Sequence, residues 1–180
     1  MKNIVSKLLV WLAFATLVAA DGTAHAWQTE AKADRWLTGT VVRVVDGDTI
    51  WLQNDLAARP LKVRIEGMDA PEVCQAGGMA SRDFLSQRIL GEIVRLKLPR
   101  SRRHDDYGRT LGRLEHDEKD IGRWMVSNGH AWTYASSRSA GPYAVEQAQA
   151  MRARRGLFSN SNAENPRSFR LRQGSCYPPR

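Results

Sequence analysis

The sequence has few of the residues on which many metal centres and nucleophilic sites are built. Among 180 residues it has two cysteines and four histidines, and the histidines show no metal-binding spacing. It has no evident serine–histidine–aspartate or cysteine–histidine arrangement, and no repeats or heptads. Carboxylates and arginines therefore remain as the candidate functional groups.

The chain also lacks an apolar run long enough to cross a membrane. The run at residues 8–20 has 13 residues, whereas a membrane-spanning helix needs about 20. Two lysines precede it, and the Ala-His-Ala sequence at 24–26 is typical of a signal peptidase site. We therefore expect residues 1–26 to be a signal peptide. Cleavage after Ala20 and an uncleaved anchor are the alternatives.

An exported chain would work in an oxidising compartment, so we expect a secreted or periplasmic protein without stable membrane association. Removing residues 1–26 leaves about 154 residues, enough for one domain with a single core. These keep 25 basic and 18 acidic residues, so the formal charge is +7. A basic surface favours polyanionic partners, although the same charge would also serve solubility alone.

Arginines and carboxylates lie at the ends of strand-like segments. Apolar and charged residues alternate over 61–66, the period of a half-buried strand, so Arg64 should project from the face opposite the apolar one. A glycine and a proline end this strand and leave Asp69 and Glu72 on a turn. A charged loop at 100–106 likewise delivers Arg109 to the start of a strand.

Counting residues places Asp48 near this turn. If the chain reverses near 57–60, residue i of a strand at 49–52 pairs with roughly residue 117 − i, which sets Asp48 opposite Asp69. Two adjacent carboxylates with a backbone carbonyl suit a hard cation such as calcium. The alternative is that Asp48 only completes a hairpin turn, in which Gly47 would supply a positive φ.

The remaining pattern predicts short strands, helices and a polar, basic tail. The tail covers residues 160–180. The expected strands cover 39–45, 94–98 and 110–114, and the expected helices cover 79–90, 121–128 and 142–155.

Four segments together resemble the thermonuclease, or staphylococcal nuclease, family: Val44–Thr49, Arg64–Glu72, Tyr107–Arg109 and Glu146–Phe158. Each is weakly specific alone, but their order and spacing are highly specific. Over residues 37–159 the resemblance implies an α+β fold, a five-stranded OB-type Greek-key β-barrel with three helices. It also implies a calcium-dependent, sugar-nonspecific nuclease that hydrolyses DNA and RNA phosphodiester bonds and leaves 3′-phosphates.

The resemblance assigns metal binding to Asp48, Asp69 and the backbone carbonyl of Ala70. Glu72 takes the place of the residue that activates or orients the attacking water, and both roles stay open. One departure is Asp106, which stands where the best-known member has a lysine and should weaken nucleotide binding.

The resemblance places Arg64 and Arg109 on the scissile phosphate and Tyr107 on the substrate. Guanidinium groups suit this task because their planar fork can hold two oxygens as negative charge develops. Either arginine alone is equally consistent with a surface ion pair. Tyr134 or Trp132 would form the aromatic platform for a base, and packing at the barrel edge is the alternative for both.

Cys74 and Cys176, as the only cysteines of an exported chain, are predicted to form a disulfide that tethers the tail beside the Asp69–Glu72 turn. Free or intermolecularly paired thiols are the alternative. In the chain-entropy model, closing a loop of about 100 residues stabilises by up to about 4–5 kcal/mol.

Two other functions compete with a nuclease. OB barrels bind nucleic acids without chemistry, but such a module has no need for all five catalytic and metal side chains. An exported structural domain would leave the two arginines and three acids unexplained. We therefore expect a monomeric enzyme that acts on DNA and RNA.

Overall fold

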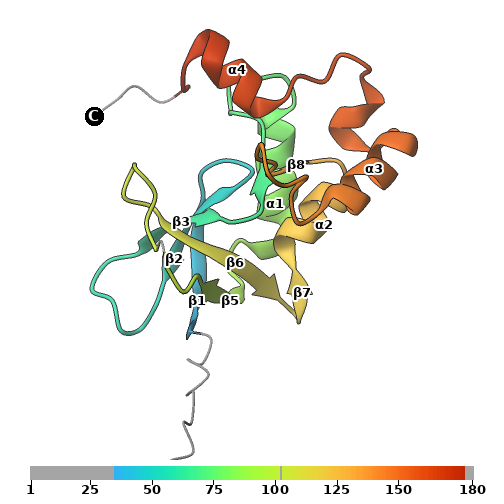
Figure 1. Ribbon diagram of the computed structural model, residues 1–180. Coiled ribbons are helices and arrows are strands. Elements are labelled where there is room, and N and C mark those ends of the chain that lie inside the picture. The colour runs from blue at the N-terminus through green and yellow to red at the C-terminus, as the bar shows by residue number, and fades with distance from the viewer. Residues whose placement is uncertain (1–34, 102, 177–180) are drawn as a thin grey trace, which may run out of the picture. The chain divides into compact units, whose positions relative to one another are not determined.

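Five strands close into a barrel in the computed structural model, which describes residues 35–101 and 103–176 (Figure 1). The sheet order is β3-β2-β1-β5-β6, and a parallel pairing of β3 with β6 closes it. The predicted α+β barrel is therefore confirmed. Its strands are β1 (Arg35–Val44), β2 (Thr49–Gln53), β3 (Leu61–Ile65), β5 (Ile93–Leu98) and β6 (Thr110–His116).

Two small strand pairs connect the barrel to the helices. β7 (Lys119–Asp120) pairs with the end of β6, and β4 (Met68–Asp69) pairs with β8 (Trp132–Thr133). The predicted signal peptide, residues 1–26, lies outside the described residues. Within the described ranges, no helix has the length and apolar character needed to span a membrane.

The helices lie together in the upper half of Figure 1, with the barrel below them. Three of them match the sequence prediction, and Asp120 caps the second by accepting a hydrogen bond from the Arg123 N–H. The helix nearest the C-terminus lies inside the segment expected to be a polar tail. The helices are α1 (Gly78–Ile89), α2 (Ile121–Ser127), α3 (Ala144–Arg152) and α4 (Pro166–Gln173), with a 3₁₀ turn at Gly156–Ser159.

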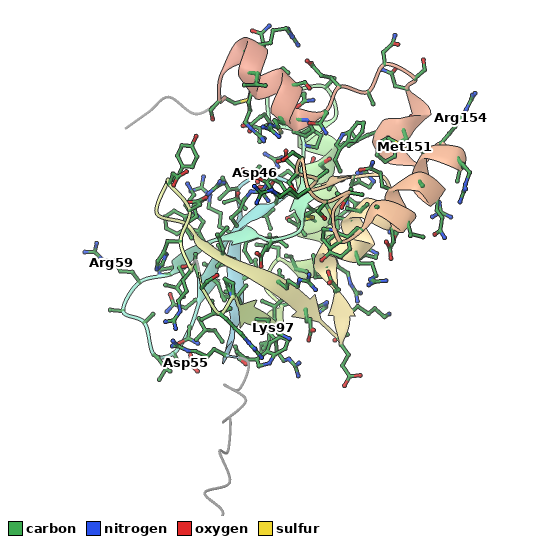
Figure 2. The ribbon with its side chains drawn as sticks, in the orientation of Figure 1. Asp46, Asp55, Arg59, Lys97, Met151 and Arg154 are labelled. Atoms are coloured by element: carbon green, nitrogen blue, oxygen red, sulfur yellow. A yellow bond between two sulfur atoms is a disulfide. The ribbon has the colours of Figure 1, made fainter. Side chains whose placement is uncertain are left out.

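The core fills the barrel and extends to α1. The alternation predicted for β3 is confirmed, because Val63 and Ile65 are fully buried whereas Arg64 is only partly buried. Leu85 and Ile89 of α1 are also fully buried. Figure 2 shows Asp46 among side chains between the barrel and the helices, whereas Arg59 and Arg154 extend outward.

The predicted register of β2 and β3 is wrong by four residues. Thr49 pairs with Arg64, and the Ile65 N–H donates to the Asp48 carbonyl at 2.8 Å, so Asp48 lies opposite Ile65. The reason is Asn54, which begins the turn early. Its carbonyl accepts from the Ala57 N–H at 3.0 Å and its side chain from the Leu56 N–H at 2.8 Å.

Candidate active site

Asp48 and Asp69 meet because the chain reverses just after β3. Gly67 has a φ of 88°, a left-handed conformation that glycine adopts without steric cost, and β4 then runs back past the start of β2. The Ala70 N–H donates to Asp48 Oδ2 at 2.9 Å. Both carboxylates are nearly inaccessible, with 6% of Asp48 and 4% of Asp69 exposed.

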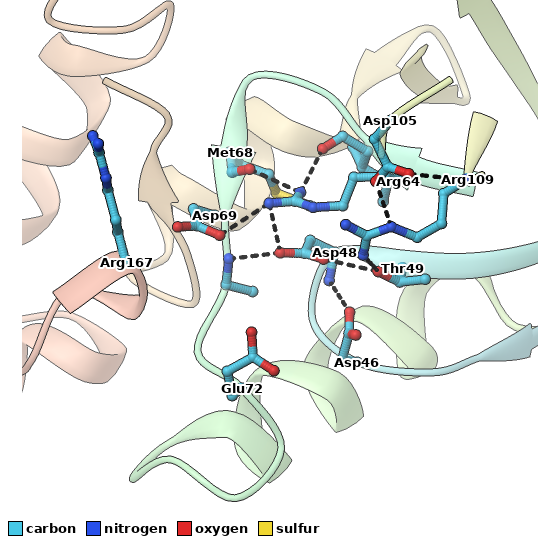
Figure 3. A network of polar contacts seen from close by, with 12 residues as sticks. Asp46, Asp48, Thr49, Arg64, Met68, Asp69, Glu72, Asp105, Arg109 and Arg167 are labelled. Carbon is cyan, nitrogen blue, oxygen red and sulfur yellow. Dashed lines mark hydrogen bonds and ion pairs between the residues drawn. The ribbon is translucent and has the colours of Figure 1, made fainter. Parts of the chain in front are cut away.

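Arg64 joins the two carboxylates (Figure 3). Its Nη2 lies 2.9 Å from Asp69 Oδ1 and 3.1 Å from Asp48 Oδ2. Its Nη1 donates to the carbonyls of Ile65 at 2.8 Å and Met68 at 2.9 Å. Because two carboxylates and two carbonyls hold this guanidinium, and its side chain is mostly shielded from solvent, it is part of the site rather than a surface ion pair.

Burial makes Asp48 an unusually weak acid. Desolvation raises its pKa to about 6, and the negative charge of Asp46 adds to this, while Arg64 and the Ala70 N–H act in the opposite direction. Asp46 also accepts from the Asp48 N–H at 3.0 Å, which fixes the turn. A second positive charge at this carboxylate would therefore be stabilising.

Gly47 is required for space rather than for a positive φ, contrary to the sequence interpretation. It is absent from the positive-φ glycines of the described chain. A Cβ at this position would lie 2.6 Å from Ala70 Cβ and 2.9 Å from Ser81 Cβ. The missing side chain therefore lets the turn that carries Asp48 approach the segment that carries Asp69.

Arg109 belongs to the same network through Thr49. The Thr49 hydroxyl accepts from Arg109 Nη1 at 3.0 Å and donates to Asp48 Oδ1 at 2.9 Å. Asp105 Oδ2 accepts from Arg109 Nε at 2.7 Å, and its Oδ1 accepts from the Arg109 N–H at 2.9 Å. Partial burial alone would raise the pKa of Asp105, but these bonds and the arginine charge lower it.

The sequence analysis missed Asp105 and Thr49. A signal for Asp105 exists, because an aspartate three residues before Gly108 is typical of a turn in which the carboxylate accepts from backbone N–H groups. Thr49 has no comparable signal, since its partner Arg109 lies 60 residues away in the chain.

Glu72 lies beside Asp69 and shares a partner with it. Its Oε1 accepts from Arg170 Nη1 at 3.2 Å. Arg170 Nη1 and Nη2 also lie 3.1 and 2.8 Å from the two carboxylate oxygens of Asp69. Burial opposes the charged form of Arg170, yet these bonds and carboxylate charges raise its pKa. Arg170 belongs to α4, and nothing local in the sequence indicates this contact.

The predicted disulfide between Cys74 and Cys176 is present, with the two Cα atoms 5.8 Å apart. Cys74 lies two residues after Glu72, and Cys176 follows α4. The disulfide therefore holds the C-terminal segment next to the turn that carries the carboxylates.

The aromatic candidates differ in exposure. Tyr107 is 82% exposed, and its ring centroid lies 5.4 Å from the Arg109 guanidinium carbon. Tyr134 is 57% exposed. Trp132 pairs with Asp69 in the small sheet and packs edge-on against Phe158 at 4.9 Å. Of the two alternatives for a base platform, Tyr134 presents its ring to solvent and Trp132 is a packing residue.

The oxygen atoms of Asp48, Asp69 and the Ala70 carbonyl are of the type that binds a hard divalent cation. Across residues 35–101 and 103–176, no group of three or more histidine, cysteine, aspartate or glutamate side chains is arranged as a metal site. Asp48, Asp69 and the Ala70 carbonyl nevertheless offer oxygen atoms only, as calcium prefers. Arg64 lies on both carboxylates and Arg170 lies on Asp69, which shows that the cluster attracts positive charge.

Comparisons with known proteins show which family the chain resembles. The family model described as "Staphylococcal nuclease homologue" matches residues 62–160. An "Uncharacterized endonuclease" of Escherichia coli O157:H7 is 33% identical over 136 residues, which cover 75% of this chain and 86% of the relative. A "Micrococcal nuclease" of Shigella flexneri is 33% identical over 144 residues, covering 73% and 79%. "Protein ParB" of Escherichia coli is 34% identical over 145 residues, covering 74% and 79%.

Proposed function

The chain belongs to the staphylococcal nuclease family, and from this premise we propose that it is an exported, calcium-dependent endonuclease that hydrolyses DNA and RNA. The observation that best supports the proposal is the single network of Arg64, Arg109, Asp48 and Asp69. Two arginines and two carboxylates at one end of the barrel match the needs of a reaction at a phosphodiester.

Arg64 and Arg109 bind the scissile phosphate in this proposal. Asp105 and Thr49 hold Arg109 at Nε and Nη1, so its orientation is set before substrate arrives. Preorganised donors stabilise developing charge without reorganising during the reaction. Arg64 is held equally firmly by the carbonyls of Ile65 and Met68.

Glu72 activates or orients the attacking water. Its backbone is fixed, because its carbonyl accepts from the Gln75 N–H at 2.8 Å and its N–H donates to Gln75 Oε1 at 3.3 Å. The carboxylate is mostly shielded from solvent and lies on the side of Asp69. A carboxylate held in this position can accept a proton from a water molecule or orient that water by a hydrogen bond, so the position suits either role.

Asp48, Asp69 and the Ala70 carbonyl would hold the calcium ion. When bound, calcium supplies positive charge to the phosphate oxygens. Calcium takes about 6–8 oxygen ligands, so three protein ligands leave most of the shell to water and substrate, and affinity should be modest. Such a site is workable outside the cytoplasm, where calcium is abundant, and the disulfide also suits an oxidising compartment.

Substrate binding without sugar preference follows from charge and aromatic rings. Without residues 1–26 the formal net charge is +7, which favours polyanions. The exposed rings of Tyr107 and Tyr134 offer faces on which bases of either nucleic acid can stack. By family resemblance, cleavage of the P–O5′ bond leaves 3′-phosphates.

A nuclease assay on the purified protein tests this function. Single- and double-stranded DNA and RNA are incubated with calcium, magnesium or chelator, and product ends are identified by mass spectrometry. We expect calcium-supported cleavage with 3′-phosphate ends, and loss of that cleavage in the Asp48→Asn/Asp69→Asn variant. Full activity after exhaustive chelation would reject the metal site. Binding without cleavage under every condition would favour a nucleic-acid-binding module.

A further inference from the structure

Arg170 occupies the carboxylates to which the proposed function assigns a cation and a water molecule. Its two terminal nitrogens lie 2.8–3.2 Å from oxygens of Asp69 and Glu72. The side chain is 33% exposed, so one side of the guanidinium faces solvent while the other faces the site. Arg170 lies beyond residues 62–160, the part of the chain that the family model matches.

This contact leaves little of Asp69 for a metal ion. Asp69 Oδ1 already accepts from Arg64 at 2.9 Å and from Arg170 at 3.1 Å, and Oδ2 accepts from Arg170 at 2.8 Å. A calcium ligand must lie about 2.3–2.6 Å from the ion, so a bound ion would be the third positive group on one carboxylate, after Arg64 and Arg170. Like charges at such distances repel, and Arg170 is the group that covers Oδ2, the oxygen that Arg64 leaves open. A bound cation therefore competes with Arg170 for Asp69.

Helix α4 is fastened on both sides of Arg170. After the helix, Cys176 is bonded to Cys74. Before it, Gln75 Nε2 donates to the Glu164 carbonyl at 2.7 Å. Cys74 and Gln75 are neighbours on the turn that follows Glu72, so both attachments keep the guanidinium close to the carboxylates. A short tether of this kind raises the local concentration of the attached group.

We propose that Arg170 is a tethered internal cation that occupies the metal carboxylates and that calcium must displace from Asp69 and Glu72 before the site is active. This inference rests on the proposed function. It makes the segment beyond residue 160 a regulator of cation loading, with the disulfide setting how often the site is occupied. If Arg170 occupies the carboxylates nine-tenths of the time, the apparent calcium Kd is about tenfold weaker than the intrinsic one.

Arg167 provides a matched control on the same helix. It lies one turn before Arg170 and carries the same charge, but it makes no ion pair with the described residues. Figure 3 draws it to one side of Asp69 without a contact. Removing either arginine lowers the positive charge near the site by one, whereas only Arg170 competes directly for carboxylate oxygens.

Calcium titration calorimetry of the oxidised protein tests the inference without reference to activity. We expect Arg170→Gln to lower the calcium Kd about tenfold, and Arg167→Gln to change it less than twofold. Equal Kd values for wild type and Arg170→Gln would overturn the inference and leave the proposed metal site standing. An equal decrease in the calcium Kd for both variants would overturn it too, because the loss of one positive charge near the site would then explain the effect. If neither the wild type nor any variant bound calcium, the inference would fall together with the metal site.

A second comparison tests the tether. The Cys74→Ser/Cys176→Ser variant, with circular dichroism to verify its fold, should bind calcium more tightly than wild type but no more tightly than Arg170→Gln. A combined variant with Arg170→Gln should gain nothing further. An unchanged Kd on removing the disulfide, beside a tighter Kd for Arg170→Gln, would overturn the part assigned to the disulfide.

Discussion

Arg64 and Arg170 both donate to Asp69, but one comes from a barrel strand and the other from a helix fastened by a disulfide. Arg64 makes two further hydrogen bonds to carbonyls of its own segment and is mostly buried. Among the described residues, the Arg170 guanidinium donates hydrogen bonds only to carboxylates, and its side chain is one-third exposed. The comparison teaches that two arginines on one carboxylate can be held very differently: Arg64 is bonded into the barrel, whereas Arg170 depends on the carboxylates and on the attachment of its helix.

The largest expected effect is the loss of folding stability when Arg64, the arginine on the barrel strand, is replaced. Arg64→Gln leaves two buried carboxylates with less positive charge, and breaking a buried pair typically costs about 3–5 kcal/mol. Urea unfolding of the metal-free protein at pH 7 measures it. Arg95→Gln is the control, since the exposed Arg95–Glu115 pair at 2.9 Å should contribute about 0–1 kcal/mol. A loss of similar size in both variants would show that Arg64 is not part of a rigid scaffold.

The second-largest expected effect is on the rate of cleavage, which should depend on the planar guanidinium group of Arg109. Arg109→Lys keeps the charge but loses the planar donor set, and removal of one preorganised donor set typically lowers turnover about 10²–10³-fold. Nucleic-acid affinity should change little, because one phosphate contact among several is affected. Single-turnover cleavage and filter binding with calcium separate the two quantities. Equal losses in both, or no loss in either, would reject the catalytic role of Arg109.

Calcium binding should weaken in acid because protons compete for Asp48. With a pKa of about 6 in the metal-free protein, the calcium Kd should rise about tenfold between pH 7 and pH 5. Calorimetry over this range tests it, and Arg170→Gln should show the same slope because Arg170 does not contact Asp48. A Kd independent of pH would contradict the prediction.

The same pKa fixes the sign of a stability effect. Because folding raises the pKa of Asp48 from 3.8 to about 6, the folded state favours the protonated carboxyl. Its contribution to the stability of the metal-free protein is therefore fully present below pH 3.8 and is lost as the pH rises through about 6.

The smallest expected effect is the loss of folding stability when Arg170, the arginine on α4, is replaced. Arg170→Gln removes a partly exposed pair and leaves Arg64 on Asp69, so the loss should be about 0–1 kcal/mol, or about 4 °C or less in Tm. Thermal unfolding of metal-free protein measures it, with Arg167→Gln as control. The difference from wild type should disappear in saturating calcium. A loss as large as that of Arg64→Gln would remove the distinction between the two arginines.

Local sequence pattern was sufficient to predict most of the barrel strands and to select Asp48, Arg64 and Arg109 as residues of the site. Alternation over 61–66 gave the burial of Val63 and Ile65 correctly, and the segments around Asp48, Arg64 and Arg109 do lie together. The register of β2 and β3 was wrong because one side chain, Asn54, decides where the turn begins. A register depends on the geometry of the turn as much as on hydrophobic alternation.

The sequence by itself determined the main barrel strands, three helices and, through the count of two cysteines, the disulfide. It also supplied five charged residues of the site: Asp48, Arg64, Asp69, Glu72 and Arg109. These depend on short-range periodicity, turn chemistry and composition, all of which act within a few residues. Only the tertiary structure decided that α4 forms, that Asp105 and Thr49 hold Arg109, and that Arg170 lies on Asp69. The contact between Arg170 and Asp69 joins residues 101 apart in the chain, and no local preference encodes such a meeting because it arises only when the barrel and the tethered helix are both in place.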